Sequence, residues 1–251
     1  MPLPVRRTSN PMLNERTFSN LPRAGVGLGG MTLKGTVDKS FLLLVVLMAA
    51  ALYPWSLLAG GDLQAVSSLM LLGFLGGFVT AMIVSFKPTT APYLAIPYAA
   101  LEGLALGGVS AVFEQRYHGI AIQAVGLTFA VLLALLIAYR TGIIRVTEQF
   151  RAMVVAATFG VMLFYLATWL LSFFHVSLQA LYAPTPLGIG VSLVVVAIAA
   201  LNVVLSFDLI SRGVAGGAPK YMEWYCAFGL MVTLVWLYLE MLRLLALTRR
   251  N

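Results

Sequence analysis

The sequence is poor in cysteine, histidine and charge. It has one cysteine, Cys226, which excludes an internal disulfide framework and a Cys-based metal cluster. Two histidines, His118 and His175, are too few for a His-rich metal site. Only 10% of the 251 residues are charged, against about 25% in an average soluble domain, and 61% are hydrophobic. These proportions predict an integral membrane protein, with the lipid bilayer as its main partner.

Motifs for common enzyme chemistry are also missing. No glycine run is followed by Lys-Ser/Thr, and neither Gly-x-Ser-x-Gly nor His-Glu-x-x-His occurs. We therefore expect no enzymatic activity and no bound cofactor. The formal charge of +7 would suggest nucleic acid in a soluble protein, but here the basic residues lie mainly in loops and tails, as membrane topology requires. No nucleic-acid partner is expected.

Seven apolar stretches are long enough to cross a bilayer core of about 30 Å as helices, which takes about 20 residues. They lie near 41–58, 65–86, 92–113, 119–138, 152–174, 186–210 and 221–247. The fold class is thus all-α with seven transmembrane helices. Residues 1–40 are expected to form a flexible basic cytoplasmic arm, 41–247 the transmembrane domain, and 248–251 a short basic tail. Pro97 is expected to kink the third span.

The positions of Lys and Arg predict the orientation. With the N-terminus inside, the inner segments hold 12 of the 16 bases and the outer segments hold 3, while Arg243 lies within the last span. This bias favours a cytoplasmic N-terminus in a bacterial inner membrane. An odd number of spans then leaves the C-terminus outside, unless the last span is re-entrant.

Small residues indicate where helices touch, because close backbone approach replaces the hydrophobic drive that lipid cannot supply. Gly73 with Gly77, and Gly103 with Gly107, repeat at four-residue spacing. We interpret both pairs as sites of tight helix packing.

Four acids lie inside or at the ends of the spans, where a charge is costly and often functional. They are Glu102 near the middle of the third span, Asp208 near the inner end of the sixth, and Glu223 and Glu240 on the seventh. Each has a simpler structural reading as a hydrogen-bonded or ion-paired group. Asp208 has Arg212 four residues on, a spacing that allows a salt bridge, although aspartate is unfavourable at a helix C-terminus.

The last span carries a patterned stripe of polar and small residues. Glu223, Cys226, Gly229, Thr233, Trp236, Glu240 and Arg243 follow one another at spacings of three and four. The stripe is expected to face the bundle interior, with Leu230, Leu234, Val235 and Leu242 facing lipid. Glu240 and Arg243, three residues apart, are placed to pair directly.

Four segments together resemble the Bax inhibitor-1 family, specifically a bacterial branch, over essentially the whole chain. They are Asn10 to Phe18 in the arm, Leu101 to Leu104, Ser206 to Ile210, and Glu223 to Leu244. The resemblance implies two layers of three helices around a central last helix. It also implies a pH-sensitive calcium leak, with an aspartate pair near the inner mouth and a basic latch at the end of the second span.

Carried over position by position, the resemblance assigns the first aspartate to Asp208 and the latch to Lys87, where Lys replaces Arg. Thr233 stands where the second aspartate should be. Glu223, near the inner end of the last span, is the substitute we consider, so Asp208 and Glu223 form a tentative Ca²⁺ site.

Two functional hypotheses follow. The leading one is a pathway for Ca²⁺ or H⁺ beside the last span, with Asp208 at the inner mouth, because hard cations prefer oxygen ligands. The alternative is a non-transporting regulator of a membrane protease or of a stress or cell-death partner. The basic arm, with its Asn-Pro-x-Leu-Asn-Glu-Arg motif, motivates this second reading.

Overall fold

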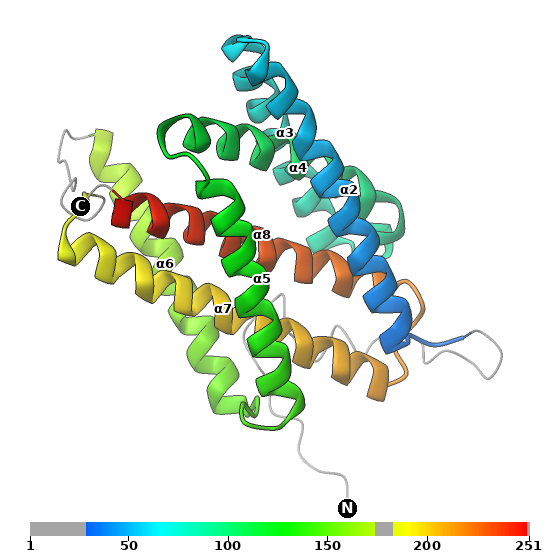
Figure 1. Cartoon of the computed structure of the whole chain (residues 1–251). Coiled ribbons are helices and arrows are strands. Elements are labelled where there is room, and N and C mark those ends of the chain that lie inside the picture. The colour runs from blue at the N-terminus through cyan, green and yellow to red at the C-terminus, as the bar shows by residue number, and fades with distance from the viewer. Residues whose placement is uncertain (1–28, 174–182, 250–251) are drawn as a thin grey trace, which may run out of the picture.

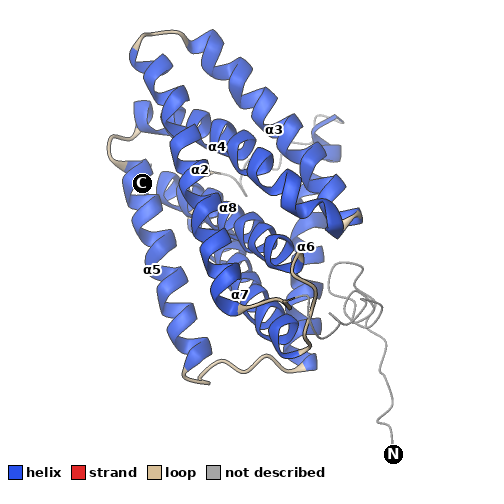
Figure 2. Ribbon diagram, turned by 90° about the vertical axis from the view of Figure 1, so that its right-hand side faces the viewer, coloured by secondary structure: helices blue, strands red, loops and turns tan. Residues whose placement is uncertain are grey.

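The computed structural model describes residues 29–173 and 183–249, and these residues form helices joined by short loops (Figure 1 and Figure 2). The elements are α2 (Leu33–Ala59), α3 (Leu63–Phe86), the short 3₁₀ helix η1 (Pro88–Thr90), α4 (Ala91–Arg116), α5 (Ile120–Arg140), α6 (Glu148–Phe173), α7 (Pro186–Ala215) and α8 (Met222–Arg249). Seven helices in the described ranges are long and apolar enough to cross a membrane. The predicted seven-span, all-α class is confirmed.

The helix boundaries differ from the expected ones mainly at the start of α2 and the end of α7. α2 begins at Leu33, within the stretch predicted as a flexible arm, and the Thr32 side chain caps it by accepting from the Gly35 N–H. α7 continues to Ala215, so Asp208 lies two turns inside the helix rather than at its C-terminus. The predicted arm up to residue 28, and Arg250 and Asn251 of the tail, lie outside the described residues.

α8 occupies the centre of the bundle. In Figure 1, α2, α3 and α4 lie above and to the right of α8, α7 lies below it and α5 crosses in front of it, and Figure 2 also shows α8 in the middle of the bundle. It packs against α2, α4, α5 and α7. Half of its most apolar stretch is buried inside the protein, whereas the share is only 11% for α6. The expected arrangement of two three-helix layers around the last helix agrees with this packing.

Glycines allow α4 to approach both α2 and α3. A Cβ at Gly107 would lie 2.7 Å from Ala51 Cα on α2, and one at Gly103 would lie 2.8 Å from Ala50 Cβ on the same helix. A Cβ at Gly73 would lie 2.5 Å from the Leu101 carbonyl oxygen of α4. The backbones therefore touch directly, as the four-residue glycine spacing predicted.

The ends of the helices define two faces. On the first face the Met31 N–H donates to the Ala218 carbonyl, so the start of α2 meets the α7–α8 loop. On the second face Arg249 donates to the His118 carbonyl (2.8 Å) and to Gln123 (2.7 Å), so the end of α8 meets the α4–α5 loop. Because α8 is one continuous helix, it is not re-entrant, and its C-terminal end lies on the face opposite the start of α2.

Candidate functional site

Asp208 is held by two arginines near the first face. Its Oδ2 accepts a hydrogen bond from Arg151 Nη2 on α6 at 3.0 Å. Arg212 Nε lies 2.9 Å from the same oxygen in an ion pair that lacks hydrogen-bond geometry. Asp208 and Arg151 are both buried, and Arg151 Nη1 also binds both carboxylate oxygens of Glu148. The predicted Asp208–Arg212 pair is present, and Arg151 adds a link between α6 and α7.

The cation expected to latch Asp208 was Lys87, which follows α3. Its side chain is exposed, and it forms no ion pair with an acid of the described residues. The contact expected of Lys87 is made instead by Arg151, which counted in the sequence only as one more base of an inner loop.

Glu223 forms a separate charged cluster at the same face. Its carboxylate, 0% exposed, accepts from the Thr32 N–H at 2.9 Å, the Thr32 hydroxyl at 2.8 Å and Lys220 Nζ at 2.8 Å, and it also pairs with Lys39. A Cβ added at Gly35 would overlap this carboxylate. The cluster joins the start of α8 to the start of α2 and shares no partner with Asp208, so the two acids do not meet in one site here.

Hydroxyl and amide groups connect α6, α7 and α8 deeper in the bundle. The Ser206 and Thr233 hydroxyls lie 3.4 Å apart, which joins α7 to α8. Asn202 Nδ2 donates to Thr158 Oγ1 at 2.8 Å, which joins α7 to α6. Thr233, which stands where the family's second aspartate is expected, therefore faces a serine rather than Asp208.

Tyr165 connects Glu240 and Arg243 farther toward the second face. Its hydroxyl donates to Glu240 Oε1 at 2.7 Å and accepts from Arg243 Nη1 at 2.6 Å. Arg243 Nη1 also lies 3.7 Å from Glu240 Oε2, and its guanidinium lies over the Tyr165 ring at 5.7 Å. The predicted Glu240–Arg243 pair is present, with an aromatic residue of α6 binding both partners.

These contacts form three separate groups at successive depths along α6, which together we call the polar row. Its members are Arg151, Thr158 and Tyr165 on α6, Asn202, Ser206 and Asp208 on α7, and Thr233, Glu240 and Arg243 on α8. The α6 members are spaced by seven residues, so they share one helix face. From Arg151 to Tyr165 this face spans roughly 21 Å at 1.5 Å per residue, most of a bilayer core of about 30 Å.

The α6 residues of the polar row are absent from the sequence-based site. Their seven-residue spacing was readable, but α6 contains no acid near the middle of the membrane, and the site was built around the acids of the spans and their partners. On α7 only Asp208 and Arg212 were assigned to the site. Polar side chains recurring at heptad spacing within an otherwise apolar helix were the available signal.

Glu102 lies apart from the polar row. It is buried on α4 and points toward α3, since a Cβ at Gly77 would lie only 2.6 Å from Glu102 Oε2. Within the described part of the chain, no hydrogen bond joins its carboxyl to another side chain. The neighbouring Tyr98 turns toward α8 and meets Phe228 edge to face, with ring centroids 4.8 Å apart.

The expected lipid-facing side of the last helix is wrong. Val235 and Leu242 are buried, and Leu230 and Leu234 are partly buried. The central helix is covered by its neighbours over most of its surface, so these side chains pack against other helices, although Val232 of the same helix is 37% exposed. The polar stripe is also divided: Glu223 turns to α2, whereas Thr233, Glu240 and Arg243 turn to α6 and α7.

No group of three or more His, Cys, Asp or Glu side chains suited to a metal ion occurs in residues 29–173 and 183–249. In this arrangement Asp208 and Glu223 are both engaged by cationic side chains. Either carboxylate would have to leave its partners before it could bind a calcium ion.

The fold and the polar row define a polytopic all-helical membrane protein with a charged and hydrogen-bonded seam beside its central helix. The chain belongs to the Bax inhibitor 1 like family, whose profile matches residues 7–250. That match covers nearly the whole chain and confirms the resemblance found in the sequence. No curated protein and no solved structure gave a significant match.

Proposed function

We propose that the protein forms a gated pathway for Ca²⁺ or H⁺ along the polar row, with Asp208 at its mouth on the first face. The observation that carries this proposal is the row itself, which runs through three helices and most of the bilayer depth. Hydroxyl, amide and carboxylate oxygens suit a hard cation. Buried polar side chains within spans commonly mark ion or proton pathways, and membership of the Bax inhibitor 1 like family supports the same function.

The geometry corresponds to a closed state of such a pathway. Arg151 and Arg212 occupy the Asp208 carboxylate, so an incoming cation finds this ligand already engaged. Thr233 and Ser206 are hydroxyl residues, so they cannot repel the Asp208 carboxylate as a second acid would. Release of Asp208 therefore depends on Arg151 and Arg212, and we assign to Arg151 the latch role that the family pattern gives to the second span.

The test is flux into vesicles. Purified protein in liposomes that contain a calcium or pH indicator should pass cations, and the flux should change between about pH 6 and about pH 8, as membership of the family suggests. Asp208→Asn should abolish that pH dependence. The matched control is Asp38→Asn, the same substitution at an exposed acid of α2 near the same face. Flux no greater than in protein-free liposomes over this range would overturn the proposal.

We further propose that the first face is cytoplasmic and that the membrane is a bacterial inner membrane, because Lys and Arg are concentrated on that face. Single cysteines introduced in a Cys226→Ala background test this orientation. An impermeant maleimide added to intact cells should label His118→Cys on the second face but not Thr89→Cys in the α3–α4 connection. The reverse pattern would invert the topology.

The regulator hypothesis rests on the basic arm, which lies outside the described residues. No contact of the described residues favours it over the ion pathway.

A further inference from the structure

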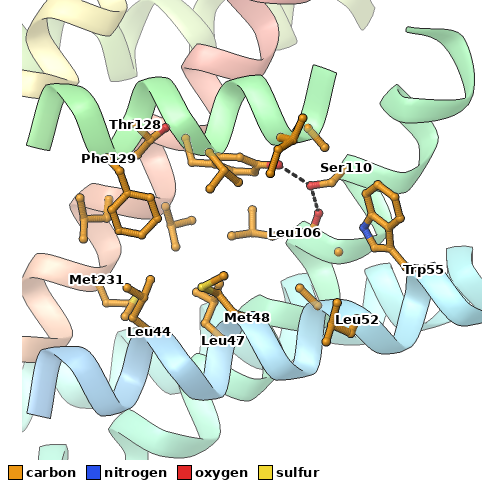
Figure 3. Close-up of a pocket in the computed structure, with 18 of the residues that line it drawn as sticks. Leu44, Leu47, Met48, Leu52, Trp55, Leu106, Ser110, Thr128, Phe129 and Met231 are labelled. Atoms are coloured by element: carbon orange, nitrogen blue, oxygen red, sulfur yellow. Dashed lines mark hydrogen bonds between the residues drawn. The ribbon is translucent and has the colours of Figure 1, made fainter. Parts of the chain in front are cut away.

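A lateral cavity lies on the side of α8 away from the polar row. Its volume is about 340 Å³, within the range of small-molecule sites. Figure 3 shows α2 along one side and α5 along the other, with α4 and α8 behind them. Leu47 and Leu52 lie on the α2 wall, Val125 and Phe129 on the α5 wall, and Met231 at the end beside Leu44.

The cavity opens between α2 and α5 toward the membrane. Leu52 and Ile122, one on each wall, are 69% and 72% exposed at this opening. Met231, at the end of the cavity beside Leu44, is 2% exposed. In a bilayer the opening meets lipid chains, so a molecule can enter sideways without crossing an aqueous phase.

The lining offers almost no free hydrogen-bonding group. The Ser110 hydroxyl lies 2.7 Å from the Tyr238 hydroxyl and also donates to the Leu106 carbonyl. The Thr128 hydroxyl donates to the Ala124 carbonyl at 2.7 Å. Since these polar groups already bind one another or the backbone, water gains little inside, and an apolar occupant is favoured.

The length of the cavity matches one leaflet. On α2 it runs from Leu44 to Trp55, eleven residues or roughly 16 Å, and half of a hydrocarbon core of about 30 Å is about 15 Å. Figure 3 places Trp55 at one end and Leu44 with Met231 at the other. Leu44 is close to the middle of α2, and Trp55 is near its end on the second face, where tryptophan commonly marks the membrane interface.

We propose that this cavity binds one acyl chain of a membrane phospholipid from the leaflet on the second face. The chain lies between α2 and α5 with its end against Met231, and the headgroup stays at the interface beside Trp55. A free fatty acid could fill the same space, but the lining provides no cation to pair with a carboxylate carried into the cavity. The proposal is therefore for a phospholipid, anchored outside by its headgroup.

The occupant would contact α8 on the side opposite the polar row. Met231, Leu234 and Val235 line the cavity, whereas Thr233 meets α7. Binding would fix α8 between the lipid chain and the row. This site does not depend on the proposed ion pathway and can be tested without measuring flux.

Photolabelling tests the site. The full-length protein is reconstituted into vesicles of phosphatidylethanolamine and phosphatidylglycerol that contain a phosphatidylcholine with a diazirine at the end of one acyl chain. After irradiation, peptide mass spectrometry should find the label on Met231, which is too deeply buried for bulk lipid to reach. Labelled Leu127, which is exposed on α5 outside the cavity, serves as the internal positive control.

A matched pair of variants tests the occupancy. Val125→Trp fills the cavity and should remove most of the label on Met231, whereas Leu127→Trp makes a similar change on the same helix and should leave it. Elution volume and melting temperature check that both variants fold. If Val125→Trp does not fold, the wild type alone still tests the site. Added unlabelled phospholipid should then reduce the labelling of Met231. Three results would overturn the proposal. The first is label on Leu127 without label on Met231, and the second is equal labelling of Met231 in both variants. The third is competition by free fatty acid but not by phospholipid.

Discussion

Gly35→Ala tests the Glu223 cluster, because its effect on the free energy of unfolding should change sign when Glu223 is replaced. In a helix, replacing glycine by alanine normally stabilises by about 1 kcal/mol. Here a Cβ at position 35 would lie 2.5 Å from Glu223 Cδ and 2.5 Å from Oε2, so the carboxylate must move. Moving it disturbs its bonds to Thr32, Lys39 and Lys220.

The size of the effect follows from those contacts. Hydrogen bonds to a charged group contribute about 1.5–3 kcal/mol, and the lysines can find water because Lys39 is 18% and Lys220 is 59% exposed. We expect a loss of about 2 kcal/mol against the gain of about 1 kcal/mol in helix propensity. Gly35→Ala should therefore destabilise the wild type by about 1 kcal/mol, the difference of these two terms. In a Glu223→Ala background, where the space is open, the same substitution should stabilise by about 1 kcal/mol.

The assay is a double-mutant cycle on purified protein in detergent, followed by thermal unfolding. The coupling of about 2 kcal/mol should appear as a difference of about 4–8 °C between the shifts in the two backgrounds, at about 2–4 °C per kcal/mol for a chain of this size. Gly126→Ala on α5, where an added Cβ meets no atom within 4 Å, is the control and should give the same stabilising shift in both backgrounds. Equal shifts for Gly35→Ala in the two backgrounds would refute the reasoning.

Three further predictions concern the latch, the glycine contacts and the tyrosine bridge. Arg151→Gln should raise cation flux in liposomes because it releases Asp208, whereas Lys87→Gln should leave flux unchanged; the opposite result would restore the latch to the end of α3. Gly107→Ala should destabilise by at least about 1–3 kcal/mol because its Cβ would press on the Ala51 backbone, and unfolding at the wild-type temperature would contradict that contact. Tyr165→Phe should lower the free energy of unfolding by about 1–3 kcal/mol through loss of the hydroxyl that binds Glu240 and Arg243, and an unchanged value would exclude a stabilising bridge.

The helical class and the number of spans were predictable because each span must satisfy its backbone hydrogen bonds within itself. Apolar length alone then identifies the crossings. The boundary at the start of α2 was not predictable in this way. Lys34 and Lys39 suggested an arm, but α2 begins at Leu33, and Lys39 is neutralised by Glu223 almost two hundred positions later in the chain. A contact over that separation leaves no local pattern.

The candidate site was predicted in part. Asp208, Glu223, Glu240 and Arg243 are buried or partly buried and bound to oppositely charged groups, as polar residues in spans should be. The prediction was wrong about the directions in which the polar side chains of α8 point. A stripe on α8 was expected to have one set of neighbours, but the helix is central.

Burial over most of the α8 surface also explains why the lipid-facing assignment failed. Hydrophobicity separates lipid-facing from protein-facing positions only weakly, because lipid tails and helix interfaces are both apolar. Leu242, 1% exposed, and Leu234, which lines the lateral cavity, are both leucines of α8. Only the arrangement of the neighbouring helices distinguishes them.

The two charged clusters at the first face differ in how their acids are stabilised. Glu223 lies in the first turn of α8 and accepts hydrogen bonds at the start of α2, so two helix N-termini favour its charge in addition to the lysines. Asp208 lies two turns inside α7, and only the side chains of Arg151 and Arg212 compensate it. Movement of α6 by a few ångströms would take Arg151 away from Asp208 and leave only Arg212, whose side chain is 35% exposed, whereas release of Glu223 would require separating α2 from α8. In the proposed pathway the Asp208 cluster is therefore the one suited to open and close, and the Glu223 cluster is suited to hold the central helix in place.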